Sequence, residues 1–299
     1  MIRNRNRLLA CALLCLLLCG CGGVSYTQRT PTYTVGVVLK AMNSQHWMEM
    51  RSGMEQAATD NNIDLKLLYP SAENREDEQD DLIRDTMNSG IDLLMVAPCN
   101  SYHTRWFVAE AEQSGLPVLT VDTQAFDSDL PYIGADNTAI GRMAAQHLSD
   151  VLPEGASVAI ISGASNQSSH NERIQAFRDT LRADLSVSSI QYTDSEFSQG
   201  YECAKNLAET PVRGIFCTSA VLGLGAAAVQ PKNAARPLIV AVDTQADAMQ
   251  AVQDGTIDAL ITQSGYDIGY RAIETALVTL RTKKMPDDVL LSGELLTKE

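Results

Sequence analysis

The sequence of 299 residues is short of basic residues and of aromatic side chains, and the aromatics make up 5% of it. Lys and Arg number 23 against 37 Asp and Glu, so the formal net charge is −14 at pH 7. Because neutralising nucleic-acid phosphates requires clustered Lys and Arg, this balance excludes nucleic acid as a partner. With 45% hydrophobic residues, 19 Gly and 10 Pro, the chain is neither disordered nor collagen-like, and its length suits about two globular domains.

The short motifs of nucleotide-binding and hydrolytic enzymes are also missing. Residues 39–47, which follow the first expected strand, contain no glycine, whereas a phosphate-binding turn needs a glycine-rich loop there. No Gly-x-Ser-x-Gly, His-Glu-x-x-His or Cys-x-x-Cys sequence occurs. We therefore expect no enzymatic activity, no cofactor and no bound metal. The histidines are scattered along the chain, at His46, His103, His147 and His170.

The first twenty residues have the features of a secretory signal. Arg3, Arg5 and Arg7 form a positive region, and the apolar run Leu8–Leu18 is too short to span a bilayer stably. We expect a signal peptide over residues 1–20. An uncleaved anchor or a buried hydrophobic segment is the alternative.

The end of this segment indicates lipid attachment. The sequence Leu18-Cys19-Gly20-Cys21 resembles a bacterial lipobox, in which the last cysteine is lipidated and becomes the new N-terminus. The lipobox predicts lipidation at Cys21 and a lipid anchor with a polar tether over residues 21–33. The protein would then lie outside the cytoplasm, anchored to the cell membrane.

Three cysteines remain beyond the lipobox, namely Cys99, Cys203 and Cys217. Each lies in or beside an apolar run, where cysteine behaves as a small hydrophobic residue. We expect free thiols, with a Cys203–Cys217 disulfide as the alternative.

After residue 33, short apolar runs alternate with longer amphipathic stretches. Near-continuous apolar strands of this kind are buried on both faces and form parallel sheets flanked by helices. Two successive series of them predict an α/β protein with two Rossmann-like lobes joined by hinge crossings near Asp136. The first series comprises residues 35–39, 65–69, 92–97 and 117–122, and the second comprises 158–161, 189–192, 214–217, 238–242 and 259–261.

The intervening stretches have helical periodicity. Ile140, Ala144 and Leu148 lie on one face of a predicted helix, and Asn137 or Thr138 is placed to cap it. The acidic stretch Glu73–Asp85 is interpreted as a solvated loop and the acidic first turn of a helix rather than as a metal site.

Polar and aromatic side chains stand where the predicted strands end. Ligands of open parallel sheets bind just beyond these ends. Carboxylates, a guanidinium, an amide and aromatic rings together suit a polyhydroxylated ligand. Structural alternatives remain open: helix caps for the aspartates, a surface ion pair for the arginine and core packing for the aromatics. The candidates are Asn43, Ser44, Trp47, Asp122, Thr123, Arg173, Phe197, Ser219, Asp243 and Gln263.

Several of these stretches carry a family resemblance in the same order along the chain. Val35–Trp47 resembles a first strand with its ligand loop, Pro117–Asp122 resembles "IPVITLD", and Gly134–Asn137 resembles "ASDN". Asn171–Phe177 resembles "RERxxGF", and Val240–Asp243 resembles "VVGFD". The chain thus resembles type I solute-binding proteins of the ribose/galactose-binding family, which are related to the ligand domain of lac-repressor-type regulators.

The resemblance implies a type I periplasmic-binding-protein fold and a set of ligand contacts. Asp122, Arg173, Asp243 and Gln263 would form hydrogen bonds, and Trp47 and Phe197 would stack on the ligand. The sequence departs from the family where Thr123 replaces a frequent Arg, where Ser219-Ala220 replaces Asn-Asp, and where Gln45-His46 replaces Pro-aromatic.

The resemblance also implies partners and a lobe division. We expect a monomer that binds a small neutral sugar or polyol and presents it to an ABC permease. The alternative is a sensing module that signals to a membrane sensor kinase or chemoreceptor. The N-terminal lobe would comprise residues 34–135 plus 264–290, and the C-terminal lobe 136–263 plus 291–299.

Overall fold

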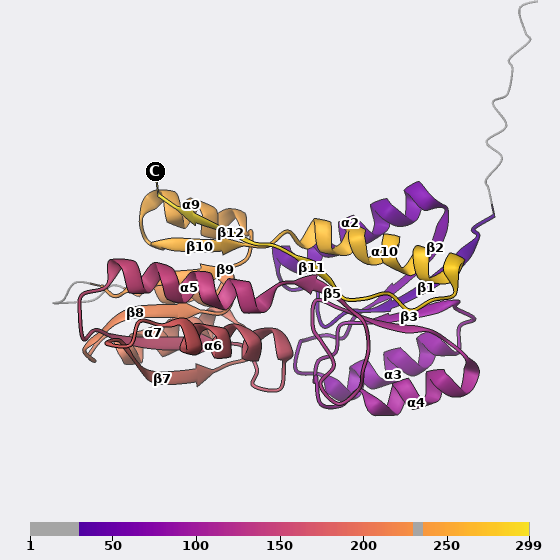
Figure 1. Cartoon of the computed structure of the whole chain (residues 1–299), viewed down its shortest axis with the longest axis horizontal. Coiled ribbons are helices and arrows are strands. Elements are labelled where there is room, and N and C mark those ends of the chain that lie inside the picture. The colour runs from indigo at the N-terminus through magenta and orange to yellow at the C-terminus, as the bar shows by residue number, and fades with distance from the viewer. Residues whose placement is uncertain (1–29, 230–235, 299) are drawn as a thin grey trace, which may run out of the picture. The chain divides into compact units, whose positions relative to one another are not determined.

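A computed structural model describes residues 30–229 and 236–298 of the chain (Figure 1). The predicted signal peptide (residues 1–20), Cys21 and the tether up to residue 29 lie outside the described residues. Pro31–Glu299 form a single unit. Within the described part of this unit the strands form two six-stranded sheets flanked by helices, so the predicted α/β class is confirmed.

The first sheet is wholly parallel, with the order β11-β5-β4-β3-β1-β2. Its order reverses between β1 and β3, which makes the carboxyl ends of these strands a natural ligand crevice. The strands are β1 (Tyr33–Val38), β2 (Ile63–Leu68), β3 (Leu93–Val96), β4 (Val118–Val121), β5 (Tyr132–Ala135) and β11 (Val289–Leu291).

Both faces of the first sheet are covered, and its strand β3 is apolar and buried at every position. Along β3, Leu93 and Met95 join one hydrophobic cluster, whereas Leu94 and Val96 join another on the opposite face. Helices α2 and α10 pack against each other on the first face, and α3 and α4 cover the second (Figure 1). These helices are α2 (Gln45–Asn61), α3 (Glu76–Met87), α4 (Arg105–Ser114) and α10 (Gly265–Thr282).

The second sheet repeats this arrangement with the order β12-β10-β9-β8-β6-β7. All neighbours are parallel except β12, which pairs antiparallel with β10. The order reverses between β6 and β8, so a second crevice is expected at their carboxyl ends. The strands are β6 (Ser157–Ser162), β7 (Ser186–Tyr192), β8 (Val212–Cys217), β9 (Leu238–Val242), β10 (Ala259–Thr262) and β12 (Glu294–Thr297).

Two layers of helices enclose the second sheet. Phe177 of α6 stacks on Phe216 of β8 with ring centroids 4.8 Å apart, which fixes α6 and its neighbour α5 on one face. On the other face α7 packs against α8, and α8 packs against α9, around a separate apolar cluster. No helix in residues 30–229 and 236–298 combines the length and apolar character needed to cross a bilayer. The helices are α5 (Asn137–Val151), α6 (Ser168–Thr180), α7 (Phe197–Leu207), α8 (Ala220–Ala227) and α9 (Ala246–Asp254).

The chain crosses between the sheets after β5, after β10 and between β11 and β12. At the first crossing the helix cap is Asp136, because its carboxylate accepts a hydrogen bond from the backbone N–H of Ala139 at 2.8 Å. The prediction of Asn137 or Thr138 as the cap was therefore wrong by one or two residues. The backbone N–H of Asp136 also donates to the carbonyl of Leu291 at 2.9 Å, which ties two crossings together.

All three described cysteines are free, so the alternative Cys203–Cys217 disulfide does not form. Cys99 and Cys217 are buried, whereas Cys203 is partly exposed. Burial raises the pKa of Cys99 to about 12 and also raises the pKa of Cys217. These thiols are therefore protonated at neutral pH and serve as packing groups.

Candidate functional site

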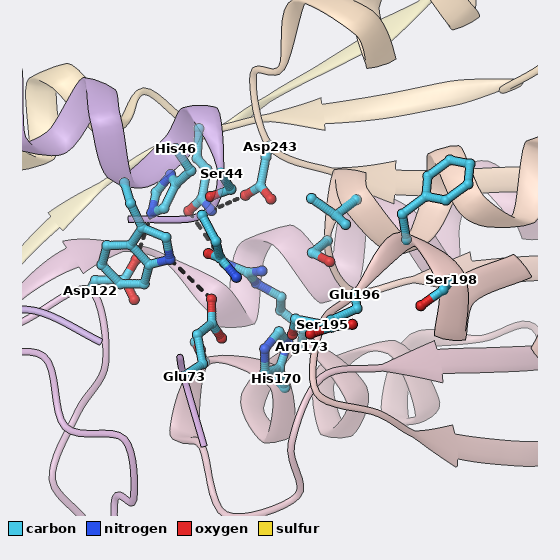
Figure 2. Close-up of a pocket in the computed structure, with 17 residues that line it drawn as sticks. Ser44, His46, Glu73, Asp122, His170, Arg173, Ser195, Glu196, Ser198 and Asp243 are labelled. Carbon is cyan, nitrogen blue, oxygen red and sulfur yellow. Dashed lines mark hydrogen bonds and ion pairs between the residues drawn. The ribbon is translucent and has the colours of Figure 1, made fainter. Parts of the chain in front are cut away.

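A pocket of about 490 Å³ lies where the carboxyl ends of strands from both sheets meet (Figure 2). We call it the main pocket. We call the first sheet with its helices the first half of the protein and the second sheet with its helices the second half. Six residues of the main pocket follow β1, β2 or β4 of the first half, and the others come from the second half. They are Asn43, Ser44, His46, Trp47, Glu73 and Asp122 from the first half, with Ser169, His170, Arg173, Ser195, Glu196, Phe197, Ser198, Ser219, Val221, Asp243 and Gln263 from the second.

The backbone is forced into left-handed conformations at three places in the main pocket. Asp122, Ser195 and Asp243 have φ angles of 62°, 61° and 100°. Residues other than glycine rarely adopt such angles, and the surrounding structure must hold them there. Asp122 directly follows β4, and Asp243 directly follows β9. The strained backbone therefore orients one carboxylate at the end of a strand in each sheet.

Asp122 is held by a cluster of cationic and hydroxyl donors. Its Oδ1 lies 2.7 Å from Nε2 of His46, and its Oδ2 lies 3.5 Å from Nζ of Lys40 and 2.9 Å from the hydroxyl of Thr123. Burial alone would raise the pKa of Asp122, but Lys40, His46 and Thr123 together hold that pKa below its usual value. The carboxylate is therefore ionised, although the side chain is only 8% exposed.

The two histidines of the main pocket have opposite electrostatics. Burial lowers the pKa of His46, but the hydrogen bond and charge of Asp122 outweigh it and raise the pKa above its ordinary value. Burial, followed by the positive charges of Arg173 and Lys40, lowers the pKa of His170 well below its ordinary value. His170 is thus neutral, with Nδ1 2.8 Å from the hydroxyl of Thr218.

Arg173 organises the second-sheet side of the main pocket. Its Nε donates to Oδ1 of Asn137 at 2.8 Å, its Nη1 to the carbonyl of Thr218 at 2.7 Å and its Nη2 to Oε1 of Gln263 at 3.3 Å. The amide of Gln263 in turn donates to Oδ1 of Asp243. A continuous chain of polar groups therefore fixes the guanidinium, the amide and the carboxylate before a ligand arrives.

The two aromatic candidates differ in exposure. Trp47 is 3% exposed, and its indole N–H donates to Oε1 of Glu73 at 3.0 Å. Its ring meets His46 edge-on with centroids 5.3 Å apart. Phe197 is 49% exposed and is thus the open aromatic surface of the main pocket.

Hydrogen bonds also join the two halves of the chain beside the main pocket. Nζ of Lys40 donates to Oε1 of Gln167 at 2.9 Å, and Oε1 of Gln45 accepts from the backbone N–H of Ala246 at 2.8 Å. Because Lys40 also contacts Asp122, one buried ammonium links a main-pocket carboxylate to the opposite half.

The predicted ligand residues gather in the main pocket with one exception. Thr123 does not line it; its side chain is fully buried and acts on the site through its hydrogen bond to Asp122. The remaining predicted residues all line the main pocket, namely Asn43, Ser44, Trp47, Asp122, Arg173, Phe197, Ser219, Asp243 and Gln263.

Sequence reasoning missed several lining residues, and some had a signal. His170 lies three residues before Arg173 on α6, so the two share a helix face. Glu73 was assigned to a solvated acidic stretch, yet its carboxylate reaches the indole of Trp47. Ser195 and Glu196 lie in the loop after β7, next to the predicted Phe197. In the described part of the chain, no group of three or more His, Cys, Asp or Glu side chains is placed to hold a metal ion.

A family model described as "Periplasmic binding protein domain" matches residues 35–284. This chain belongs to that family. The predicted resemblance is thereby confirmed at the level of the family, and the type I periplasmic-binding-protein fold accounts for the two doubly wound sheets.

Curated relatives of this periplasmic binding protein cover most of its length. It is similar to the ribose import binding protein of Bacillus subtilis, with 26% identity over 270 residues, covering 89% of this chain and 88% of the relative. It is also similar to the D-allose-binding periplasmic protein of Escherichia coli, with 26% identity over 285 residues, covering 88% and 91%. Both names describe binding proteins rather than enzymes.

Solved structures share the fold of this periplasmic binding protein. A carbohydrate-transporter solute-binding protein from Agrobacterium radiobacter in complex with D-arabinose has a TM-score of 0.82 at 23% identity, covering 89% of this chain and 94% of that one. A transporter solute-binding protein from Actinobacillus succinogenes with bound D-allose has a TM-score of 0.81 at 22% identity, covering 89% and 98%. At this level of identity the likeness establishes the fold.

Proposed function

We propose that this protein is a non-catalytic, extracytoplasmic solute-binding protein that captures a small neutral sugar or polyol and presents it to an ABC importer. The observation that carries the proposal is the meeting of Asp122 with Arg173, Asp243 and Gln263 in one pocket. Carboxylates accept hydrogen bonds from neighbouring hydroxyls, and a guanidinium donates to ring and hydroxyl oxygens. The names of the curated ribose- and allose-binding relatives support the same class of ligand.

The charges of the main pocket favour a neutral ligand. Glu73, Asp122, Glu196 and Asp243 line it, whereas Arg173 is the one guanidinium among the described residues that line it and is already bonded to protein acceptors. An anionic solute would meet these carboxylates in a partly desolvated site, where like charges repel strongly.

Capture would depend on two lobes that close on the ligand. We propose residues 34–135 plus 264–290 as the N-terminal lobe and 136–263 plus 291–299 as the C-terminal lobe. A ligand that bonds to Asp122 in one lobe and Asp243 in the other favours the closed state by its difference in affinity for the closed and open forms. A permease would then recognise the closed monomer.

Calorimetric titration tests the ligand class. The mature protein, freed of copurified ligand by unfolding and refolding, is titrated with D-ribose, D-allose, D-arabinose, D-galactose and a set of polyols. We expect binding of at least one of them. Absence of heat with every member of this panel would overturn the proposed sugar or polyol ligand.

Lipid anchoring at Cys21, after removal of residues 1–20, completes the proposal. The tether over residues 21–33 would let the binding domain reach a permease. We expect the full chain to partition into the membrane fraction of a bacterial host and Cys21→Ser to abolish lipid labelling. Equal labelling of both proteins would overturn the anchor.

A further inference from the structure

A second hollow adjoins the main pocket. It has a volume of about 480 Å³, and Glu73 and Ser195 line both spaces, so the two meet at these side chains. Figure 2 shows Glu73 and Ser195 along one border of the main pocket. We call this hollow the side pocket; its walls include Glu73, Glu76, Asn166, Tyr192, Asp194 and Ser195.

The side pocket has the same chemistry as the main pocket but no cationic side chain. The described residues that line it include carboxylates, amides and hydroxyls and no Lys, Arg or His. Each pocket also has one half-exposed aromatic residue, Phe197 in the main pocket and Tyr192 in the side pocket, each 49% exposed. An aromatic ring flanked by hydrogen-bond acceptors suits the C–H face and the hydroxyls of a sugar ring.

Acceptors in the side pocket are free to take ligand hydroxyls. Glu73 uses Oε1 for the indole of Trp47, and Asp194 uses Oδ2 for the amide of Gln199. In the described part of the chain no protein donor reaches Oε2 of Glu73 or Oδ1 of Asp194. Glu73 lies at the junction and could therefore accept from a ligand in either pocket.

Hydrogen bonds already connect the two halves of the protein beside the side pocket. The amide of Asn166 donates to Oε1 of Glu76 at 2.8 Å, and the carbonyl of Asn166 accepts from the backbone N–H of Ser101 at 2.9 Å. Beside them Lys40 donates to Gln167. These bonds set the shape of the side pocket without a ligand, which lowers the cost of ordering it on binding.

We propose that the cleft takes a ligand of two sugar units, a disaccharide or a glycoside with a second hydroxyl-bearing ring. One ring lies in the main pocket, and the other lies in the side pocket against Tyr192, with hydroxyls on Glu73 and Asp194. The inference rests on the proposed sugar-binding function. Its physical basis is that the main pocket of about 490 Å³ is by itself within the ~300–1,000 Å³ range of small-ligand sites, and that the adjoining side pocket adds about 480 Å³ with an aromatic ring and free acceptors of its own.

Matched calorimetric titrations test the proposal on the mature, ligand-free protein. D-galactose is compared with melibiose and lactose, and D-glucose is compared with maltose, cellobiose and trehalose. We expect at least one disaccharide to bind about tenfold or more tightly than the monosaccharides it contains. Tyr192→Ala and Asp194→Asn should remove most of that gain and leave monosaccharide affinity within about twofold.

Tyr266→Ala is the matched control, because Tyr266 lies on α10, is 38% exposed and lines neither pocket. Its disaccharide affinity should equal that of the unmodified protein. If monosaccharides bind and no disaccharide binds more tightly, or if Tyr192→Ala keeps the gain, the two-unit ligand is overturned and the proposed function stands. If no sugar in these titrations binds and no member of the earlier panel of monosaccharides and polyols binds either, the proposed function falls, and this inference falls with it.

Discussion

Nε2 of His46 lies 2.7 Å from Oδ1 of Asp122, and both side chains are buried in the wall of the main pocket. The charged and titratable groups acting on His46 are Asp122 and Asp243, which raise its pKa, and Arg173, which lowers it. A raised pKa in the folded state contributes stability below the ordinary value of 6.5, and that contribution is lost as pH rises through the folded value. The lowered pKa of Asp122 has the opposite pH dependence: it contributes stability above the ordinary value of 3.8, and that contribution is lost as pH falls through the folded value.

The first prediction concerns this pair. We expect His46→Gln to lower Tm most between about pH 4 and 6.5, where both members of the pair are charged, and less as pH rises above that window. Scanning calorimetry of both proteins at several pH values measures the difference. In an Asp122→Asn background the same substitution should lose this trend, because the partner charge is gone. A Tm difference that grows with pH would contradict the ion pair.

The second prediction concerns Arg173. Arg173→Ala removes hydrogen bonds to Asn137, Thr218 and Gln263, so buried acceptors lose their donors. We expect the free energy of unfolding to fall by about 2–4 kcal/mol and the affinity for the best panel sugar to fall by about 100-fold. Urea unfolding and calorimetry measure the two effects. Arg178→Ala, an exposed position on the same helix, should change neither.

The third prediction separates charge from backbone strain at Asp243. Asn tolerates the left-handed conformation that Asp243 adopts, so Asp243→Asn should leave Tm nearly unchanged while affinity falls by about 10–100-fold. Asp243→Ala keeps the strained φ of 100° without a side chain suited to it, and we expect it to lose about 1 kcal/mol more stability than the Asn variant. Equal unfolding curves for the two variants would contradict a contribution of backbone strain at Asp243 to stability.

The fourth prediction concerns the contact between α2 and α10. A Cβ added at Gly53 would overlap the backbone carbonyl of Tyr266, and a backbone atom cannot turn aside as a side-chain tip can. We expect Gly53→Ala to lower the free energy of unfolding by about 2–4 kcal/mol despite its better helix propensity. Ser52→Ala, an exposed neighbour on the same helix, should be neutral or slightly stabilising in the same urea titration.

With the exception of β5, the sequence predicted the strands that are buried at every position. Leu93–Val96 is apolar at every position and fully buried, so the pattern could be recognised without tertiary information. The runs missed were β5, β11 and β12. The last two are edge strands with half-exposed side chains such as Leu290 and Leu295, and a mixture of exposed and covered residues gives no continuous apolar signal.

A site residue could be predicted from the sequence when its position directly after a buried strand is enough to bring it into the pocket. Asp122 and Asp243 follow buried strands, and that position brings them into the main pocket. Glu73 was not predictable in this way, because its partner Trp47 is 26 residues distant and only the packing of the loop after β2 on α2 brings them together. The burial of Thr123 behind Asp122 likewise depends on packing that no spacing reveals.

The pairing of β5 with β11 has a consequence for how the chain folds. The backbone N–H of Tyr132 donates to the carboxylate of Asp288, 156 residues away, and the whole second sheet except β12 lies between them in sequence. The first sheet therefore cannot acquire its last strand until nearly all of the second has been synthesised. Closing so large a loop costs entropy before any contact is gained, so the two sheets should mature together and late. Until β11 is added, the chain remains incompletely folded and therefore accessible to proteins that bind unfolded chains.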